Sequence, residues 1–336
     1  MTEPATPSVG GALSEQRFWA LLKATLPYAG LVILIGVLSA LRSETFLTID
    51  NFTIVIKRSS YVIIAAVGMT MVIVSGGIDL SVGSVFAFSG VAGALAVLAG
   101  VPVPLGIGLG IVAGAGCGLV SGGMITLLRV PPFIATLGML WAIRGLGEAI
   151  THGGVAQYVP NPGWKWLYSD LTTMQLGTYE VPVPVPVVLM VVIVLLFTYI
   201  MRRTRLGRYT YAIGSNPEAA RLSGVRIQRV LVIIYTISGA LAGLSGMILA
   251  AKLSSGVATE GIGEELTVIA AVVIGGGSLS GGVGTVGGCV IGALLMSFLA
   301  NGCNLLGIEQ HWQKVIAGAI VVAAVAFDQW QHRRGG

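Results

Sequence analysis

Charged residues are scarce in this chain. Asp, Glu, Lys and Arg make up 10% of its 336 residues, whereas a soluble domain carries about 25%. Hydrophobic residues account for 55%, and the mean hydropathy is +0.90. This composition excludes an ordinary soluble domain and indicates a protein with several spans in the lipid bilayer. The net charge of +5 resides mostly in loops, and aromatic residues are few (7%), so no nucleic-acid partner is expected.

The signatures of covalent chemistry are also missing. None of the five lysines follows a glycine, which excludes a G-x-x-x-x-G-K-[ST] phosphate-binding loop. Neither a His-Glu-x-x-His zinc motif nor a Gly-x-Ser-x-Gly nucleophile elbow occurs. The three cysteines lie in apolar context without metal-ligand spacing, and their odd number argues against a disulfide framework. We therefore expect no catalytic residue, metal site or cofactor in this chain, and a role in moving or anchoring something.

Long apolar runs dominate what is present. A membrane-crossing helix needs about 20 apolar residues. Ten candidate segments occur, at 24–41, 58–75, 84–100, 105–128, 132–150, 183–201, 230–251, 265–277, 285–303 and 313–330. The eighth is short and is predicted to be a broken or partial helix, and the first is interpreted as a retained helix rather than a signal peptide. The fold class is thus all-α: a polytopic membrane protein with about ten transmembrane helices and broken or re-entrant glycine-rich segments.

Arginines give the predicted orientation. Residues 202–229 hold seven arginines and one acid, and basic loops between spans lie in the cytoplasm. Arg333 and Arg334 follow the last span, so both termini are predicted to be cytoplasmic. The domain organisation is then a tail at 1–20, a transmembrane domain at 21–330 containing the loop 202–229, and a tail at 331–336.

The predicted external loop covers residues 151–182. Its aromatic residues Trp164, Trp166 and Tyr168 are interpreted as interfacial anchors in preference to a ligand site. The alternating Val-Pro run at 181–186 cannot form regular helix and predicts an extended lead-in to the sixth span. In the fifth span, Arg144 and Glu148 have the i, i+4 spacing of a self-neutralising pair.

Glycines recur at every fourth residue in three spans. They are Gly106, Gly110, Gly114, Gly118 and Gly122 in the fourth, Gly239 and Gly243 in the seventh, and Gly284, Gly288 and Gly292 in the ninth. Such glycines let helix backbones approach closely in lipid. Packing within one subunit is favoured over a seam between two copies.

A short helix is predicted inside the arginine-rich loop. Asn216 is a helix N-cap, Pro217 suits the first helical position, and Glu218 is an acid in the first turn. Gly224 is a natural stop. This small-residue helix is suited to docking against another protein.

Two polar, glycine-rich segments interrupt the apolar pattern, at residues 75–84 and 275–285. They share an alignable core and are interpreted as a weak internal repeat. Paired interruptions of this kind are typical of a transport pathway or its gate. The candidate path or gate residues are Ser75, Gly76, Gly77, Asp79, Ser81, Gly276, Gly277, Ser278 and Ser280. For Asp79 two roles stay open and are compatible: a gate or mechanical contact, or a carboxylate that caps the following helix.

These residues carry a resemblance to a family. The runs at 66–70, 75–84, 204–208, 214–224 and 275–285, in this order, resemble membrane permease subunits of bacterial ABC importers for monosaccharides such as ribose, xylose, arabinose and galactose. Glu218-Ala219-Ala220 followed by Gly224 resembles the Glu-Ala-Ala…Gly motif of the loop that couples such permeases to their ATPase. The Leu-Pro that closes the family motif is replaced here by Thr236-Ile237.

The resemblance implies an ABC importer permease in the bacterial inner membrane. Its implied partners are an ABC ATPase subunit that holds ATP and Mg, a periplasmic sugar-binding protein, and a second permease subunit, identical or related. The implied coupling residues are Asn216, Pro217, Glu218, Ala219, Ala220, Arg221 and Gly224. The alternatives are a permease for branched-chain amino acids or nucleosides, an ion-coupled secondary carrier, for which the spans offer few ionisable groups, and a scaffold or channel. The particular sugar cannot be read from the sequence.

Overall fold

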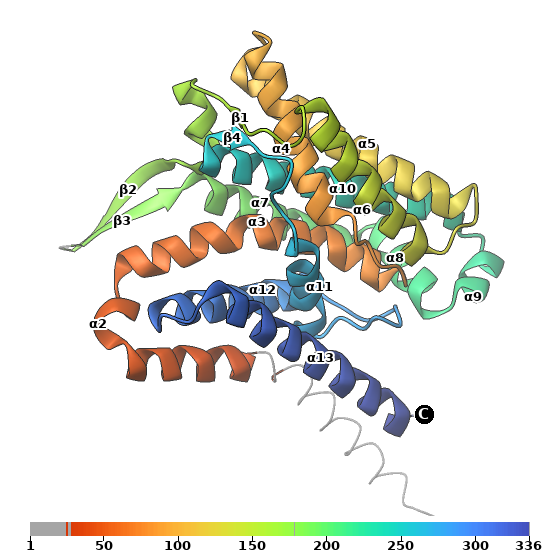
Figure 1. Ribbon diagram of the computed structural model, residues 1–336. Coiled ribbons are helices and arrows are strands. Elements are labelled where there is room, and N and C mark those ends of the chain that lie inside the picture. Colours follow the sequence, from red (N-terminus) through yellow and green to blue (C-terminus); the bar gives the residue numbers. More distant parts are fainter. Residues whose placement is uncertain (1–24, 26–27, 178, 336) are drawn as a thin grey trace, which may run out of the picture.

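The computed structural model describes residue 25, residues 28–177 and residues 179–335 (Figure 1). The predicted tail at 1–20 lies outside these residues. The helices after Tyr28–Leu41 are α2 (Ser43–Phe46), α3 (Ile49–Val74), α4 (Val82–Leu98), α5 (Val103–Thr126), α6 (Pro132–Ile150), α7 (Val185–Arg203), α8 (Arg205–Ser215), α9 (Pro217–Leu222), α10 (Ile227–Leu253), α11 (Glu264–Ile274), α12 (Val286–Leu305) and α13 (Gln310–Gly335). The chain is therefore a predominantly helical, multi-span membrane protein, as the composition predicts.

Six of the helices in the described residues are long and apolar enough to cross a membrane: α3, α5, α6, α7, α10 and α12. The helix Tyr28–Leu41 and α4 are apolar but shorter. Helix α11 has 11 residues, and at 1.5 Å per residue it rises roughly 16 Å, about half of the hydrocarbon core. This confirms the prediction that the segment 265–277 forms only a short helix.

Helices α3 and α10 form the centre of the bundle. In α3, 67% of the apolar window is buried, against 22% in α6 and in α7. Helix α3 packs against α10, α12, α7 and α11, and α10 also packs closely against α5. The outer helices therefore present most of their apolar side chains outward, as expected for helices that face lipid.

The repeated glycines pack within this one subunit, as predicted. A Cβ atom added to Gly114 of α5 would lie 2.5 Å from the carbonyl oxygen of Gly239 in α10. Gly292 of α12 likewise leaves no room beside the Ala271 carbonyl of α11. By contrast, a Cβ on Gly116 would meet nothing within 4 Å. The every-fourth-residue glycines thus mark the seams between neighbouring helices, except Gly284, which precedes α12 and adopts a φ of +153°.

Two small antiparallel sheets were not predicted. Strand β1 (Gln157–Tyr158) pairs with β4 (Ser255–Gly256), and β2 (Asp170–Leu176) pairs with β3 (Tyr179–Pro184) in a hairpin that extends away from the helices (Figure 1). Strand β3 contains residues 181–184 of the Val-Pro run, which are extended as predicted, but the prediction is wrong for Val185 and Pro186, because proline fits the first turn of a helix. Helix α7 begins after it, at Val185.

The interpretation of the external aromatic residues is partly wrong. Trp164, in the 3-10 helix Pro162–Tyr168, is only 1% exposed, and its Nε1 donates a hydrogen bond to the Ala250 carbonyl at 3.1 Å. Trp166 is 53% exposed and remains a candidate anchor. Trp164 packs against α10, which is distant in the sequence. This position is favourable because the indole buries a large area there while its N–H still donates a hydrogen bond.

Successive connections between the helices lie at opposite ends of the bundle. At one end, Lys57 Nζ lies 2.7 Å from Asp170 Oδ1, and β1 pairs with β4. At the other end, α8 and α9 lie beside the turns that follow α3 and α11, on the side of the molecule opposite the β2–β3 hairpin (Figure 1). The predicted coupling loop and both predicted glycine-rich segments therefore share one region.

Candidate functional site

The short helix predicted in the coupling loop (residues 202–229) is α9. Asn216 Oδ1 accepts a hydrogen bond from the Ala219 N–H at 2.9 Å, and Pro217 occupies the first turn. The helix ends at Leu222, and Gly224 adopts a φ of +82°. Because glycine adopts positive φ without strain, Gly224 can redirect the chain toward α10.

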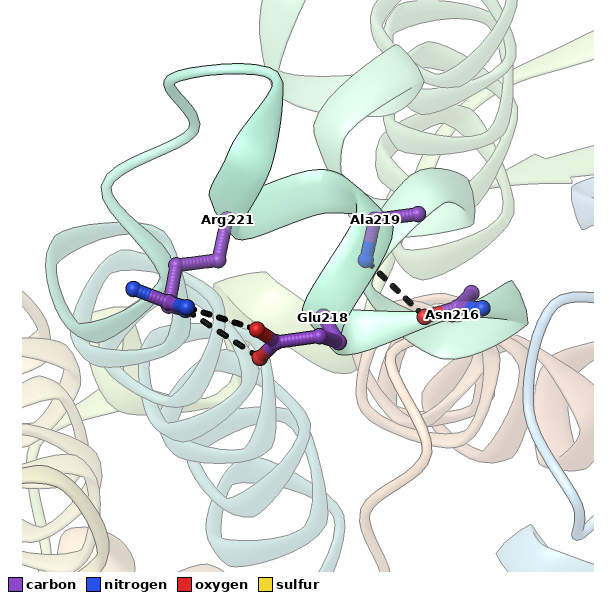
Figure 2. A network of polar contacts seen from close by, with 4 residues as sticks. All are labelled: Asn216, Glu218, Ala219 and Arg221. Atoms are coloured by element: carbon purple, nitrogen blue, oxygen red, sulfur yellow. Dashed lines mark hydrogen bonds and ion pairs between the residues drawn. The ribbon is translucent and has the colours of Figure 1, made fainter.

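One face of α9 is open to solvent. Glu218 and Arg221 form a two-pronged ion pair on it, with Nη2–Oε1 at 2.6 Å and Nε–Oε2 at 3.1 Å (Figure 2). The Arg221 guanidinium beside Glu218 holds the pKa of that carboxyl below its usual value. Leu222 is 75% exposed, whereas Ala220 is buried against the protein's own body. Ala220 therefore seats the helix on this chain and is not available to a partner, unlike the other predicted coupling residues.

Helix α8 of the coupling loop contacts both glycine-rich segments through Gly214. A Cβ on Gly214 would overlap the Val74 carbonyl oxygen and lie 2.5 Å from the Gly282 nitrogen. The Gly282 N–H itself donates to the Val74 oxygen at 2.9 Å. One turn earlier, Tyr211 Oη donates to the Gly284 carbonyl at 2.7 Å. Three backbone segments distant in the sequence thus meet at a single point.

The two glycine-rich segments begin with the same turn. After α3, the Gly76 N–H donates to Ile73 O at 2.9 Å and the Gly77 N–H to Val72 O at 3.0 Å. After α11, the equivalent bonds are Gly276 to Val273 at 2.9 Å and Gly277 to Val272 at 2.8 Å. Both are Schellman motifs, which require positive φ at the first donor, and Gly76 (+83°) and Gly276 (+88°) supply it. The matching geometry supports the interpretation of an internal repeat.

The first segment carries Asp79, which is 2% exposed. Its Oδ1 accepts hydrogen bonds from the Ser81 N–H at 2.9 Å and the Ser81 Oγ at 2.6 Å. Helix α4 begins at the next residue, Val82. Asp79 therefore binds Ser81, the N-cap residue of α4, and does not cap the helix itself, because no N–H of α4 donates to a side chain at this end. A role in gating stays a prediction. The preceding carbonyl, of Ile78, accepts from Thr136 Oγ1 of α6 at 3.0 Å.

The second segment folds back on itself. The Ser278 N–H donates to Val283 O at 3.0 Å, and the Ser280 N–H lies 3.3 Å from Ser278 Oγ. Ser278 is buried, whereas Ser280 is exposed. Of the predicted path residues in this segment, only Ser280 and Gly276 thus face outward, and Gly277 and Ser278 are enclosed.

Comparison with known proteins decides the family. Residues 51–325 match the model described as "Branched-chain amino acid transport system / permease component". The chain belongs to this permease family. It is 38% identical to the ribose import permease protein RbsC of Escherichia coli K12 over 328 residues, 96% of this chain and 98% of that protein. No solved structure matches it.

Two further relatives align over most of their length. The ribose import permease protein RbsC of Bacillus subtilis is 39% identical, covering 90% of this chain and 92% of that protein. The galactose/methyl galactoside import permease protein MglC of Haemophilus influenzae is 32% identical, covering 96% and 99%.

The non-helical segment predicted between the seventh and eighth spans of this permease makes contacts that the sequence did not predict. This segment, residues 254–263, follows α10 and runs along α4; it is called the outer segment because the predicted orientation places it on the outer side of the membrane. Arg144 of α6 holds it: Nη1 donates to the carbonyls of Ala258 at 2.5 Å and Glu260 at 2.6 Å. The predicted Arg144–Glu148 pair is therefore wrong, because carbonyls without helical partners compete for the guanidinium. Three glycines within eight residues, Gly256, Gly261 and Gly263, were the available signal.

Within the described residues, no group of three or more His, Cys, Asp or Glu side chains could hold a metal ion. Cys117, Cys289 and Cys303 are free thiols.

Proposed function

We propose that this permease is the membrane-spanning subunit of an ATP-driven ABC importer, and that it forms the path for a monosaccharide delivered by a periplasmic binding protein. The contact of Gly214 with both glycine-rich segments carries the mechanism, because it joins an exposed docking helix to the interruptions of two spans. The printed names of the relatives, ribose and galactose import permeases, support the sugar class. They do not favour branched-chain amino acids, which only the family description mentions.

In this proposal, α9 docks on a separate ATPase subunit, which binds ATP and Mg; this chain holds no cofactor. The exposed residues Asn216, Pro217, Glu218, Ala219 and Arg221 form the docking face, with Gly224 shaping its end. A displacement of α9 by the ATPase moves α8, and Gly214 passes the movement to the turns at Val74 and Gly282. Coupling between distant sites needs such a contiguous element with two arrangements.

The proposed topology has ten crossings with both termini in the cytoplasm. Helix Tyr28–Leu41, α4, α11 and α13 supplement the six long spans. The arginines of the coupling loop and the position of the C-terminal end of α13, on the same side of the molecule as α9 (Figure 1), support this orientation. The transmembrane domain then covers 21–330, and a second permease subunit, identical or related, completes the path.

Reconstitution tests the function. Proteoliposomes containing the permease, its ATPase and the binding protein should take up a labelled pentose or hexose only with ATP and the binding protein present. Uptake of sugar by the permease alone, with no ATPase, would overturn the proposal.

A further inference from the structure

The outer segment crosses part of the bundle without helical structure. Near its start, a Cβ on Gly256 would lie 2.7 Å from the Gly90 carbonyl oxygen of α4. Near its end, a Cβ on Gly261 would lie 2.5 Å from the Gly83 carbonyl oxygen. Seven residues of helix separate these two points of α4, so the segment descends about 10 Å, a third of the hydrocarbon core.

Irregular backbone at this depth needs hydrogen-bond partners from the protein. Arg144 provides two, to Ala258 and Glu260, and its side chain is itself buried. At the lower end, Glu265 Oε1 accepts from the Gly263 N–H at 3.1 Å. An arginine inside a span is costly unless it bonds to such groups, so the segment and Arg144 stabilise one another.

The segment fills the space that it covers. The cavity between it, α4 and α10 measures about 10 Å³, which barely admits one water molecule. Nothing the size of a sugar fits there while the segment stays in this place. Gly261 (φ +73°) and Gly263 (φ +88°) lie at its lower end, where backbone freedom would let it swing.

The first glycine-rich segment approaches the same part of α4 from the opposite end of the bundle. Residues 75–81 lead from the end of α3 to the start of α4, where Gly83 lies. Gly83 in turn contacts Gly261 of the outer segment. Two irregular segments from opposite ends of the bundle thus meet at the first turn of α4.

We propose that the outer segment is the outward gate of the translocation path and that Arg144 is the positioning residue that keeps it closed. The inference rests on the proposed transport function. In the closed state Arg144 holds the Ala258 and Glu260 carbonyls against α6. Opening breaks these two bonds and moves the segment away from α4, which exposes the path to the binding protein's side.

A disulfide can lock the gate without altering Arg144. A Cβ on Gly147, one turn beyond Arg144, would lie 3.6 Å from the Ala258 Cβ, within the range of disulfide geometry. We therefore suggest Gly147→Cys with Ala258→Cys in a background where the three native cysteines are Ala. In the reconstituted complex, oxidation with copper phenanthroline should reduce uptake to background and dithiothreitol should restore it. Each single variant is the control and should be insensitive.

The outcomes separate the two proposals. Equal uptake by the oxidised and reduced double variant, with the disulfide shown on a gel, overturns the gate. Absence of ATP-dependent uptake in the reduced protein and in the parent overturns the transport function instead.

The role of Arg144 has a readout independent of transport. Adding Arg144→Met to the cysteine pair should slow disulfide formation, because the segment leaves α6 more often. Arg144→Lys should largely restore the rate, since an ammonium group still donates to carbonyls, and Glu148→Gln should leave it unchanged. An unchanged rate in Arg144→Met overturns the assignment of Arg144.

Discussion

Gly214 and Val74 lie so close that no side-chain carbon fits between them. Gly214 lies in the last turn of α8, within the coupling loop, and Val74 is the last residue of α3. Gly282 N–H completes the junction by donating to the same Val74 carbonyl. The backbone of the loop therefore rests directly on the backbone of a central span.

Replacing Gly214 by Ala should separate these backbones. Overpacking of this kind costs about 1–3 kcal/mol, and we expect ATP-dependent uptake to fall more than the amount of permease in the membrane. Gly123→Ala in α5 is the matched control, because its Cβ would meet nothing within 4 Å. Uptake per molecule equal to that of the parent would show that the junction does not transmit movement.

Glu218→Lys should abolish ATP-dependent uptake while leaving membrane insertion intact. The substitution places a second cation beside Arg221 on the exposed face of α9, where the parent has an ion pair. Glu309→Lys is the control, since Glu309 is equally exposed and pairs with His311 near α13. Co-purification with the ATPase measures the docking step directly. If Glu218→Lys still captures as much ATPase as the parent, α9 does not form the docking face.

Gly224→Pro should uncouple the permease from its ATPase. Proline cannot adopt the φ of +82°, and it removes the N–H that donates to Arg221 O at 3.0 Å. Gly307→Pro is the control, because it makes the same local change elsewhere in the chain. Gly307 has a φ of +72°, and its N–H donates to Asn304 O at 3.0 Å. ATP-dependent uptake should be lost only in the first, and equal losses would point to a general folding defect.

Asp79→Asn separates the two roles of this residue. The amide oxygen can still accept from Ser81, so the start of α4 should survive, while the carboxyl group is lost. We expect uptake to fall more than the amount of protein in the membrane. Asp79→Ala removes the acceptor and should lower both. Equal losses of uptake and abundance in Asp79→Asn would leave Asp79 with a structural role alone.

Gly239→Ala should destabilise the seam between α5 and α10. Its Cβ would overlap the Gly114 carbonyl and lie 2.9 Å from Gly118 Cα. We expect a loss of about 1–3 kcal/mol, visible as a lower melting temperature in detergent. Gly116→Ala, on the open face of α5, should be neutral or slightly stabilising because alanine favours helix. Equal melting temperatures for the two variants would mean that the seam can relax.

Local patterns predicted local structure well. The start of α9 follows from Asn216 and Pro217, and the turns after α3 and α11 follow from their glycines. What the sequence could not predict is where these elements meet. Nothing near Gly214 in the chain indicates Val74 or Gly282, because their contact depends on how four helices pack.

The errors have the same origin. Helical spacing paired Arg144 with Glu148, but carbonyls more than a hundred residues away bind the guanidinium instead. Interfacial preference assigned Trp164 to the membrane surface, but the Ala250 carbonyl of α10 holds it in the interior. In both cases a carbonyl group distant in the sequence binds the side chain, and a local rule cannot predict it.

The side-chain-free contact of Val74, Gly214 and Gly282 has a mechanical consequence. Where side chains separate two helices, a change of side-chain rotamer can absorb a small displacement of one helix before the other helix moves. Here main chain contacts main chain, so in the proposed mechanism no side-chain rotamer can absorb a displacement of α9 before it reaches the turns that follow α3 and α11.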